Sequence, residues 1–263
     1  MNAILCSRTL LIAFITSLSL ISSALADKPV DLHLIGGGSL GYSSFDFPAK
    51  LDHKLTFPVY QINAAIAYKK FYVVINLADS LANADVSEEE DVGSASRYDR
   101  DLSVGYQMTS SWGVFAGYKT GETKIDFYNR EELDDGTATV REESYLQKGP
   151  FVGVSYSKKF SSAGKLSFSL AYADLNATNT FTRDVDIDPG EDPEFDDLEG
   201  TVKGKVKGLS YGVRWSIPVS GNLLYYANFK VNDYKQDITF NNIQYNDIDQ
   251  TITYFTTGIV YVY

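Results

Sequence analysis

Few side chains in this sequence are suited to catalysis. The 263 residues include two histidines, His33 and His53, and one cysteine, Cys6. A general base needs a partner that orients it across a cleft, whereas Asp52 is simply the sequence neighbour of His53. We therefore expect His53 to be a surface residue, His33 to be a packed one, and the protein not to be an enzyme.

Carboxylates offer a second kind of chemistry. Asp184, Asp186 and Asp188 occupy alternate positions in an acidic segment, and carboxylate oxygens are ligands for Ca²⁺ and Mg²⁺. Pro189 stands where an EF-hand has its turn glycine, and Phe195 stands where its bidentate glutamate falls, which excludes that family. Our preferred interpretation of the segment is a solvated acidic loop. The alternative is a weakly bound divalent cation at these three aspartates, and no other cofactor is expected.

A third set of polar residues lies in segments where apolar and polar side chains alternate, as they do in β-strands. Ten such segments are found: Leu32–Tyr42, Phe57–Tyr68, Phe71–Leu81, Tyr98–Met108, Trp112–Tyr128, Tyr145–Tyr156, Leu166–Ala173, Gly208–Ile217, Leu223–Asn232 and Thr251–Tyr263. Five charged residues fall on the face opposite the apolar one: Asp99, Asp101, Lys119, Arg214 and Lys230.

The connections between these strands alternate between long and short. The long ones cover 44–56, 82–97, 129–144, 183–201 and 239–247, and the short ones cover 69–70, 109–111, 161–164 and 218–222. An up-and-down transmembrane barrel has long extracellular loops, short periplasmic turns and an even number of strands. The sequence therefore predicts an all-β fold, an antiparallel transmembrane β-barrel of about ten strands.

A soluble barrel is the rival interpretation, since its strands also alternate. Its outer face would carry many lysines and glutamates, whereas the non-apolar face here is mainly Gly, Ser, Ala, Asn and Thr. Aromatic residues such as Tyr68, Phe71, Trp112 and Trp215 also stand beside the short turns, as in the aromatic girdle of a membrane barrel. Both features favour an apolar face that contacts lipid.

The N-terminal 26 residues predict a secretory signal peptide. One arginine, Arg8, precedes an apolar run from Leu10 to Leu20, and Ala24-Leu25-Ala26 forms an A-x-A cleavage site. The run is shorter than the roughly 20 apolar residues of a transmembrane helix. We expect residues 1–26 to be removed and residues 27–263 to form the barrel domain.

The last strand closes the predicted barrel. Phe255, Ile259, Tyr261 and the terminal Tyr263 share one of its faces. This pattern resembles the C-terminal signature of Gram-negative outer-membrane β-barrels, which their assembly machinery reads. The resemblance implies a small porin-like or surface-antigen barrel in the bacterial outer membrane, a monomer that contacts lipid and lipopolysaccharide and binds no nucleic acid. No motif of the ten-stranded omptin proteases accompanies the histidines.

Two functions remain open. Connections 82–97, 129–144 and 183–201 hold 20 acidic residues against four arginines, a net charge of −16, while the whole chain has −11. This acidity favours a surface role in adhesion, envelope structure or cation binding. The inward charges favour either a packed ion-pair network, which is our preferred interpretation, or a narrow channel for small polar solutes or ions.

Overall fold

The computed structural model describes residues 32–46, 54–88, 91–129, 141–161, 163–181, 200–240 and 243–263. These residues form eleven β-strands: β1 (Leu32–Asp46), β2 (Lys54–Tyr68), β3 (Phe71–Ser80), β4 (Ala84–Glu88), β5 (Asp91–Gln107), β6 (Trp112–Asn129), β7 (Arg141–Phe160), β8 (Gly164–Phe181), β9 (Gly200–Ser220), β10 (Leu223–Phe240) and β11 (Ile243–Val262). No helix within this part of the chain is long and apolar enough to cross a membrane.

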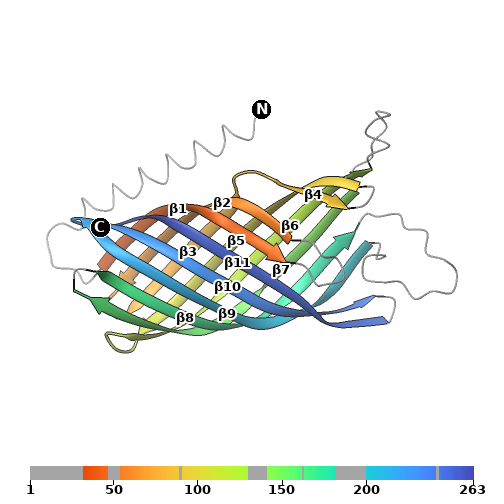
Figure 1. Cartoon of the computed structure of the whole chain (residues 1–263). Helices are drawn as coiled ribbons and strands as arrows, with labels where there is room; N and C mark the ends of the chain where they lie inside the picture. The colour runs from red at the N-terminus through yellow and green to blue at the C-terminus, as the bar shows by residue number, and fades with distance from the viewer. Residues whose placement is uncertain are drawn as a thin grey trace.

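Ten of the strands form a closed antiparallel barrel (Figure 1). Strands β5 to β11 pair in sequence order, β11 pairs with β1, and β3 pairs with β5 to complete the ring. The predicted fold class and strand number are therefore confirmed. The end that carries the short connections 69–70, 108–111, 161–163 and 221–222 is called the turn end below, and the opposite end is called the loop end.

Strand β4 is the extra strand, and it corrects the prediction of a loop over 82–97. It pairs with β5 from Ala84↔Ala95 to Glu88↔Asp91, beyond the point where β3 ends. Ala84 and Val86 are buried, so alternate residues of this segment pack inward. The connection predicted over 239–247 is likewise mostly strand, because β10 reaches Phe240 and β11 starts at Ile243.

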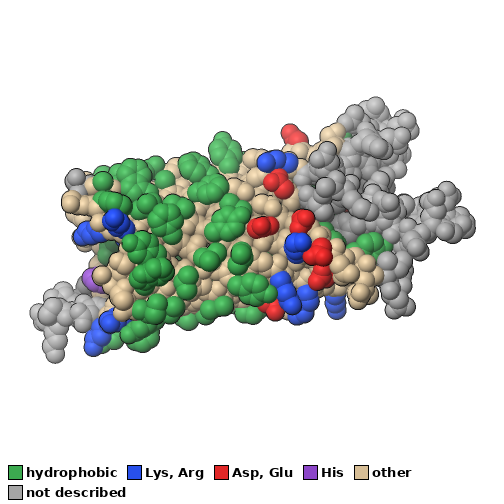
Figure 2. Space-filling model, turned by 60° about the horizontal axis from the view of Figure 1, so that its bottom comes forward, with side chains coloured by type: hydrophobic (Ala, Val, Ile, Leu, Met, Phe, Trp, Pro, Cys, Tyr) green, Lys and Arg blue, Asp and Glu red, His purple; other side chains and the backbone are tan. Residues whose placement is uncertain are grey.

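The strands are longer than a membrane requires. A transmembrane strand needs about 9–11 residues, whereas β9 has 21 and β7 has 20. Large apolar side chains cover the outer surface toward the turn end, and charged side chains appear on that surface closer to the loop end (Figure 2). Only part of each long strand can therefore face lipid.

Strand β9 shows how the pattern changes along a strand. Toward the turn end, Leu209, Tyr211, Val213 and Trp215 point outward and are exposed. Toward the loop end the outward positions are lysines, Lys203, Lys205 and Lys207, and the inward positions Val202 and Val206 are 1% and 0% exposed. The apolar face thus moves from the outside of the barrel to its inside near Gly208.

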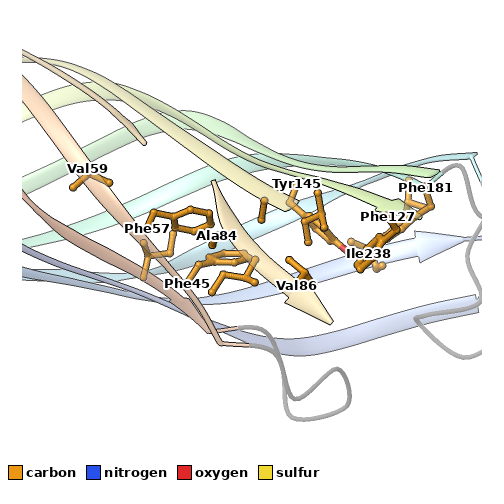
Figure 3. Packing of buried hydrophobic residues seen from close by; sticks show 14 residues of the cluster. Phe45, Phe57, Val59, Ala84, Val86, Phe127, Tyr145, Phe181 and Ile238 are labelled. Carbon is orange, nitrogen blue, oxygen red and sulfur yellow. The ribbon is translucent and has the colours of Figure 1, made fainter. Parts of the chain in front are cut away.

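The other long strands change in the same way, and their inward apolar side chains meet in one cluster (Figure 3). We call it the loop-end core. Its members are buried inside the barrel: Phe45, Leu55, Phe57, Val59, Ala84, Val86, Ala95, Ile125, Phe127, Tyr145, Phe181, Val202, Ile238 and Ile252. The barrel is consequently built like a membrane protein toward the turn end and like a soluble protein toward the loop end.

Candidate functional site

A polar cavity lies inside the barrel, on the turn-end side of the loop-end core. Its volume is about 200 Å³, and its wall includes Asp101, Lys119, Arg214 and Lys230. A smaller cavity of about 50 Å³ shares Asp101, Lys119 and Lys230 and adds Asp99. The structure thus places all five predicted lumenal residues on the inner wall, and four of them around the larger space.

Two of the three cations of the larger cavity, Lys119 and Arg214, contact aromatic residues. Lys119 Nζ donates a hydrogen bond to the Tyr234 hydroxyl at 2.9 Å. The Arg214 guanidinium lies over the Tyr226 ring, with Cζ 4.4 Å from the centroid. Among the described residues, no carboxylate oxygen lies within 4.0 Å of Lys119, Arg214 or Lys230.

Asp101 does not complete the expected ion-pair network. Its backbone is paired directly with that of Lys119 across β5 and β6, yet its Oδ1 accepts a hydrogen bond from Asn76 Nδ2 at 2.7 Å. Lys119 reaches Tyr234 instead. The preferred interpretation of the lumen as a packed network of ion pairs therefore does not describe this cavity.

One inward ion pair does form, at the boundary between the cavity and the loop-end core. Arg97 Nη2 lies 2.8 Å from Asp99 Oδ1, and the side chain of Arg97 is 5% exposed. Arg97 Nη1 donates to Thr123 Oγ1 at 2.7 Å, and the Tyr254 hydroxyl donates to Asp99 Oδ2. Gly121 faces this pair: a Cβ there would lie 2.4 Å from Asp99 Oδ1.

Arg97 falls in the predicted connection 82–97, so this cluster was not predicted from the sequence. Val92, Ser94 and Ser96 alternate with Gly93, Ala95 and Arg97, which extends the inward phase of Asp99 and Asp101 toward the loop end. The signal was weak because small residues dominate both faces. A buried arginine held by a carboxylate, a threonine and a tyrosine satisfies most of its donors, as a buried charge requires.

Several predicted site residues lie outside the described residues. These are Asp184, Asp186 and Asp188, the predicted cation ligands, and His53. Within the part of the chain that the structure describes, no group of three or more His, Cys, Asp or Glu side chains could hold a metal ion. His33 is exposed near the start of β1 rather than packed as expected.

The closing strand displays its aromatic face outward. Phe255, Ile259, Tyr261 and Tyr263 are between 42% and 54% exposed on the outer surface. The Tyr261 and Tyr263 rings lie 4.6 Å apart, and the Tyr263 amide donates to the Leu34 carbonyl. The proposed recognition residues are thus accessible from the side of the barrel that would face lipid or another protein.

Aromatic pairs mark the turn end of the outer surface. The rings of Phe71 and Tyr106 lie 4.9 Å apart, and those of Trp112 and Tyr156 lie 5.0 Å apart. Trp215 donates its indole N–H to the Ala163 carbonyl at 2.8 Å. Amphipathic rings at one level are typical of a membrane–water interface.

Comparisons with known proteins identify the fold. No family model and no curated protein matches the sequence. Among solved structures, the outer-membrane protease OmpT of Escherichia coli matches with a TM-score of 0.52 and 15% identity, over 90% of this chain and 98% of that chain. The translocator domain of the autotransporter NalP of Neisseria meningitidis matches with a TM-score of 0.46 and 13% identity, over 97% of both chains. The likeness to OmpT concerns the fold alone: the chain has the fold of the ten-stranded β-barrels of Gram-negative outer membranes.

Proposed function

We propose that this protein is a closed outer-membrane barrel that acts at the cell surface through its acidic loops, and that it is not an enzyme. In this proposal the turn end is periplasmic and the loop end extracellular. The outward residues of β11 serve as contacts for the barrel assembly machinery, and the folded barrel is a monomer surrounded by lipid and lipopolysaccharide. The observation that carries the proposal is the loop-end core.

The loop-end core favours a closed lumen. Phe45 and Phe57 are both 0% exposed inside the barrel, and Ile238 of the same cluster is 2% exposed. Interiors packed with apolar side chains leave few voids larger than one water molecule. An ion that crossed this region would lose its hydration against mainly apolar side chains, with only a few buried amides such as Gln147 and Gln250 as polar partners.

The same core makes the loop end a rigid support. The outer face of β8 becomes polar at Asp174, and the strand continues to Phe181. At about 3.3 Å per residue and a tilt of roughly 40°, this segment projects on the order of 20 Å beyond the apolar belt. The loop-end tip of this strand is thereby held at a distance from the lipid surface.

The charge of those loops indicates what kind of partner they would attract. Segments 82–97, 129–144 and 183–201, which include β4 and the loop-end parts of β5 and β7 as well as the connections, have a net charge of −16, larger in magnitude than that of the whole chain. Such a field attracts cationic partners and accelerates their association, more strongly at low salt. Cationic segments of other surface molecules, or divalent cations shared with lipopolysaccharide, fit this chemistry.

A binding assay with a polycation tests the surface role. Fluorescent polylysine should bind proteoliposomes that carry the folded protein, and added salt should weaken this binding. Deletion of residues 184–199 should reduce it several-fold, because the deletion removes nine carboxylates. Lys230→Met, which alters the lumen alone, is the matched control. Equal binding by the deletion variant would contradict the proposal.

A narrow channel is the second candidate, and the polar cavity is the observation that favours it. Planar-bilayer recordings separate the two functions. A closed barrel gives no conductance steps, whereas a channel gives discrete steps that change when Lys230 or Arg214 is neutralised. Such steps in the wild-type protein would overturn the proposed closed barrel.

A further inference from the structure

The charge inside the larger cavity is unbalanced. Lys119, Arg214 and Lys230 line it together with one carboxylate, that of Asp101. Asp99 does not offset this positive charge, since Arg97 already binds both of its oxygens at 2.8 and 2.9 Å. The larger cavity therefore carries two more positive than negative charges.

All three cations are half-buried, and cations partly removed from water in this way are costly unless they are paired. The free-energy cost of removing a cation from water is offset by a close opposite charge and by hydrogen bonds from its remaining donors. Lys119 has one hydrogen bond, to a neutral hydroxyl, and Arg214 stacks on a ring. No described residue forms an ion pair with Lys230.

Among the described residues, Asp101 forms no ion pair with any of these three cations. Asn76 donates to Asp101 Oδ1 at 2.7 Å. Tyr234, which lies on the far side of the barrel interior from β6, accepts from Lys119 and is itself held by Ser210 at 2.9 Å. The cationic groups are thus held apart from the neighbouring carboxylate.

We propose that this cavity is a binding site for a small oxyanion, such as phosphate, sulfate or a carboxylate, held by Lys119, Arg214 and Lys230. A volume of about 200 Å³ far exceeds the roughly 15 Å³ that a single water needs. It accommodates a tetrahedral oxyanion with a few waters. Ser103, Ser169 and Asn228 on the same wall supply neutral hydrogen-bond donors.

The forked donors of an arginine match two oxygens of such an anion, and two ammonium groups supply charge from other directions. Because the loop-end core closes the opposite side, the anion enters from the turn end. Ser169, an inward residue of β8 between the outward Phe168 and Leu170, is exposed, so solvent reaches this level of the lumen. The inference does not depend on the surface role of the loops.

Calorimetric titration of the folded full chain with inorganic phosphate, in a chloride-poor buffer, tests the proposal. We expect one saturable site, with weaker binding of chloride, which cannot accept several hydrogen bonds through separate oxygens. Lys230→Met should weaken phosphate binding about 10- to 100-fold, since a hydrogen bond to a charged group contributes about 1.5–3 kcal/mol. Lys205→Met, an exposed outward lysine on β9, should leave it unchanged.

A second variant distinguishes a binding site from a damaged lumen. Asp101→Asn removes the single carboxylate that repels the anion and should strengthen phosphate binding several-fold. A merely structural defect would weaken it. Heat-modifiable migration on a gel confirms that each variant is folded. Absence of saturable phosphate binding by the wild type up to about 10 mM, equal affinity for chloride, or weaker binding by Asp101→Asn would each overturn the proposal.

Discussion

Truncating a side chain of the loop-end core should be more costly than truncating the same side chain on the lipid-facing surface. Phe57 is 0% exposed inside the barrel, while Phe168 is 44% exposed on its outer surface. A phenylalanine buries about 150–250 Å², which at about 25 cal/mol per Å² corresponds to roughly 4–6 kcal/mol of transfer free energy. Alanine keeps part of this buried area, which makes the transfer loss smaller than for the whole side chain, and with the cavity left in a packed interior we expect a total loss of about 3–5 kcal/mol.

Phe168→Ala is the matched control, because fluid lipid or detergent chains fill the space that it leaves. It loses transfer free energy but creates no cavity, so its cost should be smaller by about 1–3 kcal/mol. Urea unfolding in detergent, followed by the fluorescence of Trp112 and Trp215, measures both free energies of unfolding. Equal costs, or a larger cost for Phe168→Ala, would refute the assignment of Phe57 to a packed core.

Three further predictions concern charged groups. Arg97→Met leaves Asp99 buried without its partner and should lower the free energy of unfolding by about 3–5 kcal/mol; adding Asp99→Asn should recover part of this loss, and no recovery would argue against the pair. Gly121→Ala places a Cβ 2.4 Å from Asp99 Oδ1 and should destabilise by about 1–3 kcal/mol; an unchanged urea midpoint would show that the pair does not occupy this space. The hydrogen bond from Lys235 to Asp247 raises the pKa of Lys235. The contribution of this bond to the free energy of unfolding is therefore complete below the usual lysine pKa of about 10.4, and it is lost as pH rises through the higher folded pKa. The stability difference between wild type and Lys235→Met should be constant from about pH 6 to 9 and shrink above that range.

The sequence predicted the membrane-spanning part of the fold well. Outward apolar residues recur at every second position in this part, as in Leu209, Tyr211 and Val213 of β9, and this period indicates both the strand and its lipid-facing side. The closed ten-stranded barrel follows from the alternation of long and short connections.

The loop end was harder to predict because the pattern changes phase there. In β9 the inward valines Val202 and Val206 alternate with outward lysines, which is the signature of a soluble strand. These valines do not continue the outward apolar pattern of the membrane-spanning part, so the predicted strand began only at Gly208. A search along each strand for inward as well as outward apolar residues at every second position would have extended β9 to Val202 and brought Arg97 into the barrel.

The partners of the lumenal charges could not be predicted at all. Strand pairing places Asp101 beside Lys119, and a pairing argument would join them. The structure shows instead that Lys119 reaches Tyr234 on β10, 115 residues away. Such contacts across the barrel depend on its diameter and on side-chain rotamers, neither of which the sequence pattern specifies.

Cysteine accessibility along β9 tests the central claim, that the barrel reverses its polarity between its two ends. In a background where Cys6, the one native cysteine, is replaced by serine, single cysteines at Val206, Lys207 and Tyr211 are reacted with a membrane-impermeant maleimide in intact proteoliposomes. We expect rapid labelling at position 207, and almost none at 206, which is buried inside the barrel, or at 211, which faces lipid. Labelling at 206 as rapid as at 207 would mean that water fills the loop end of the lumen, which would contradict the closed barrel.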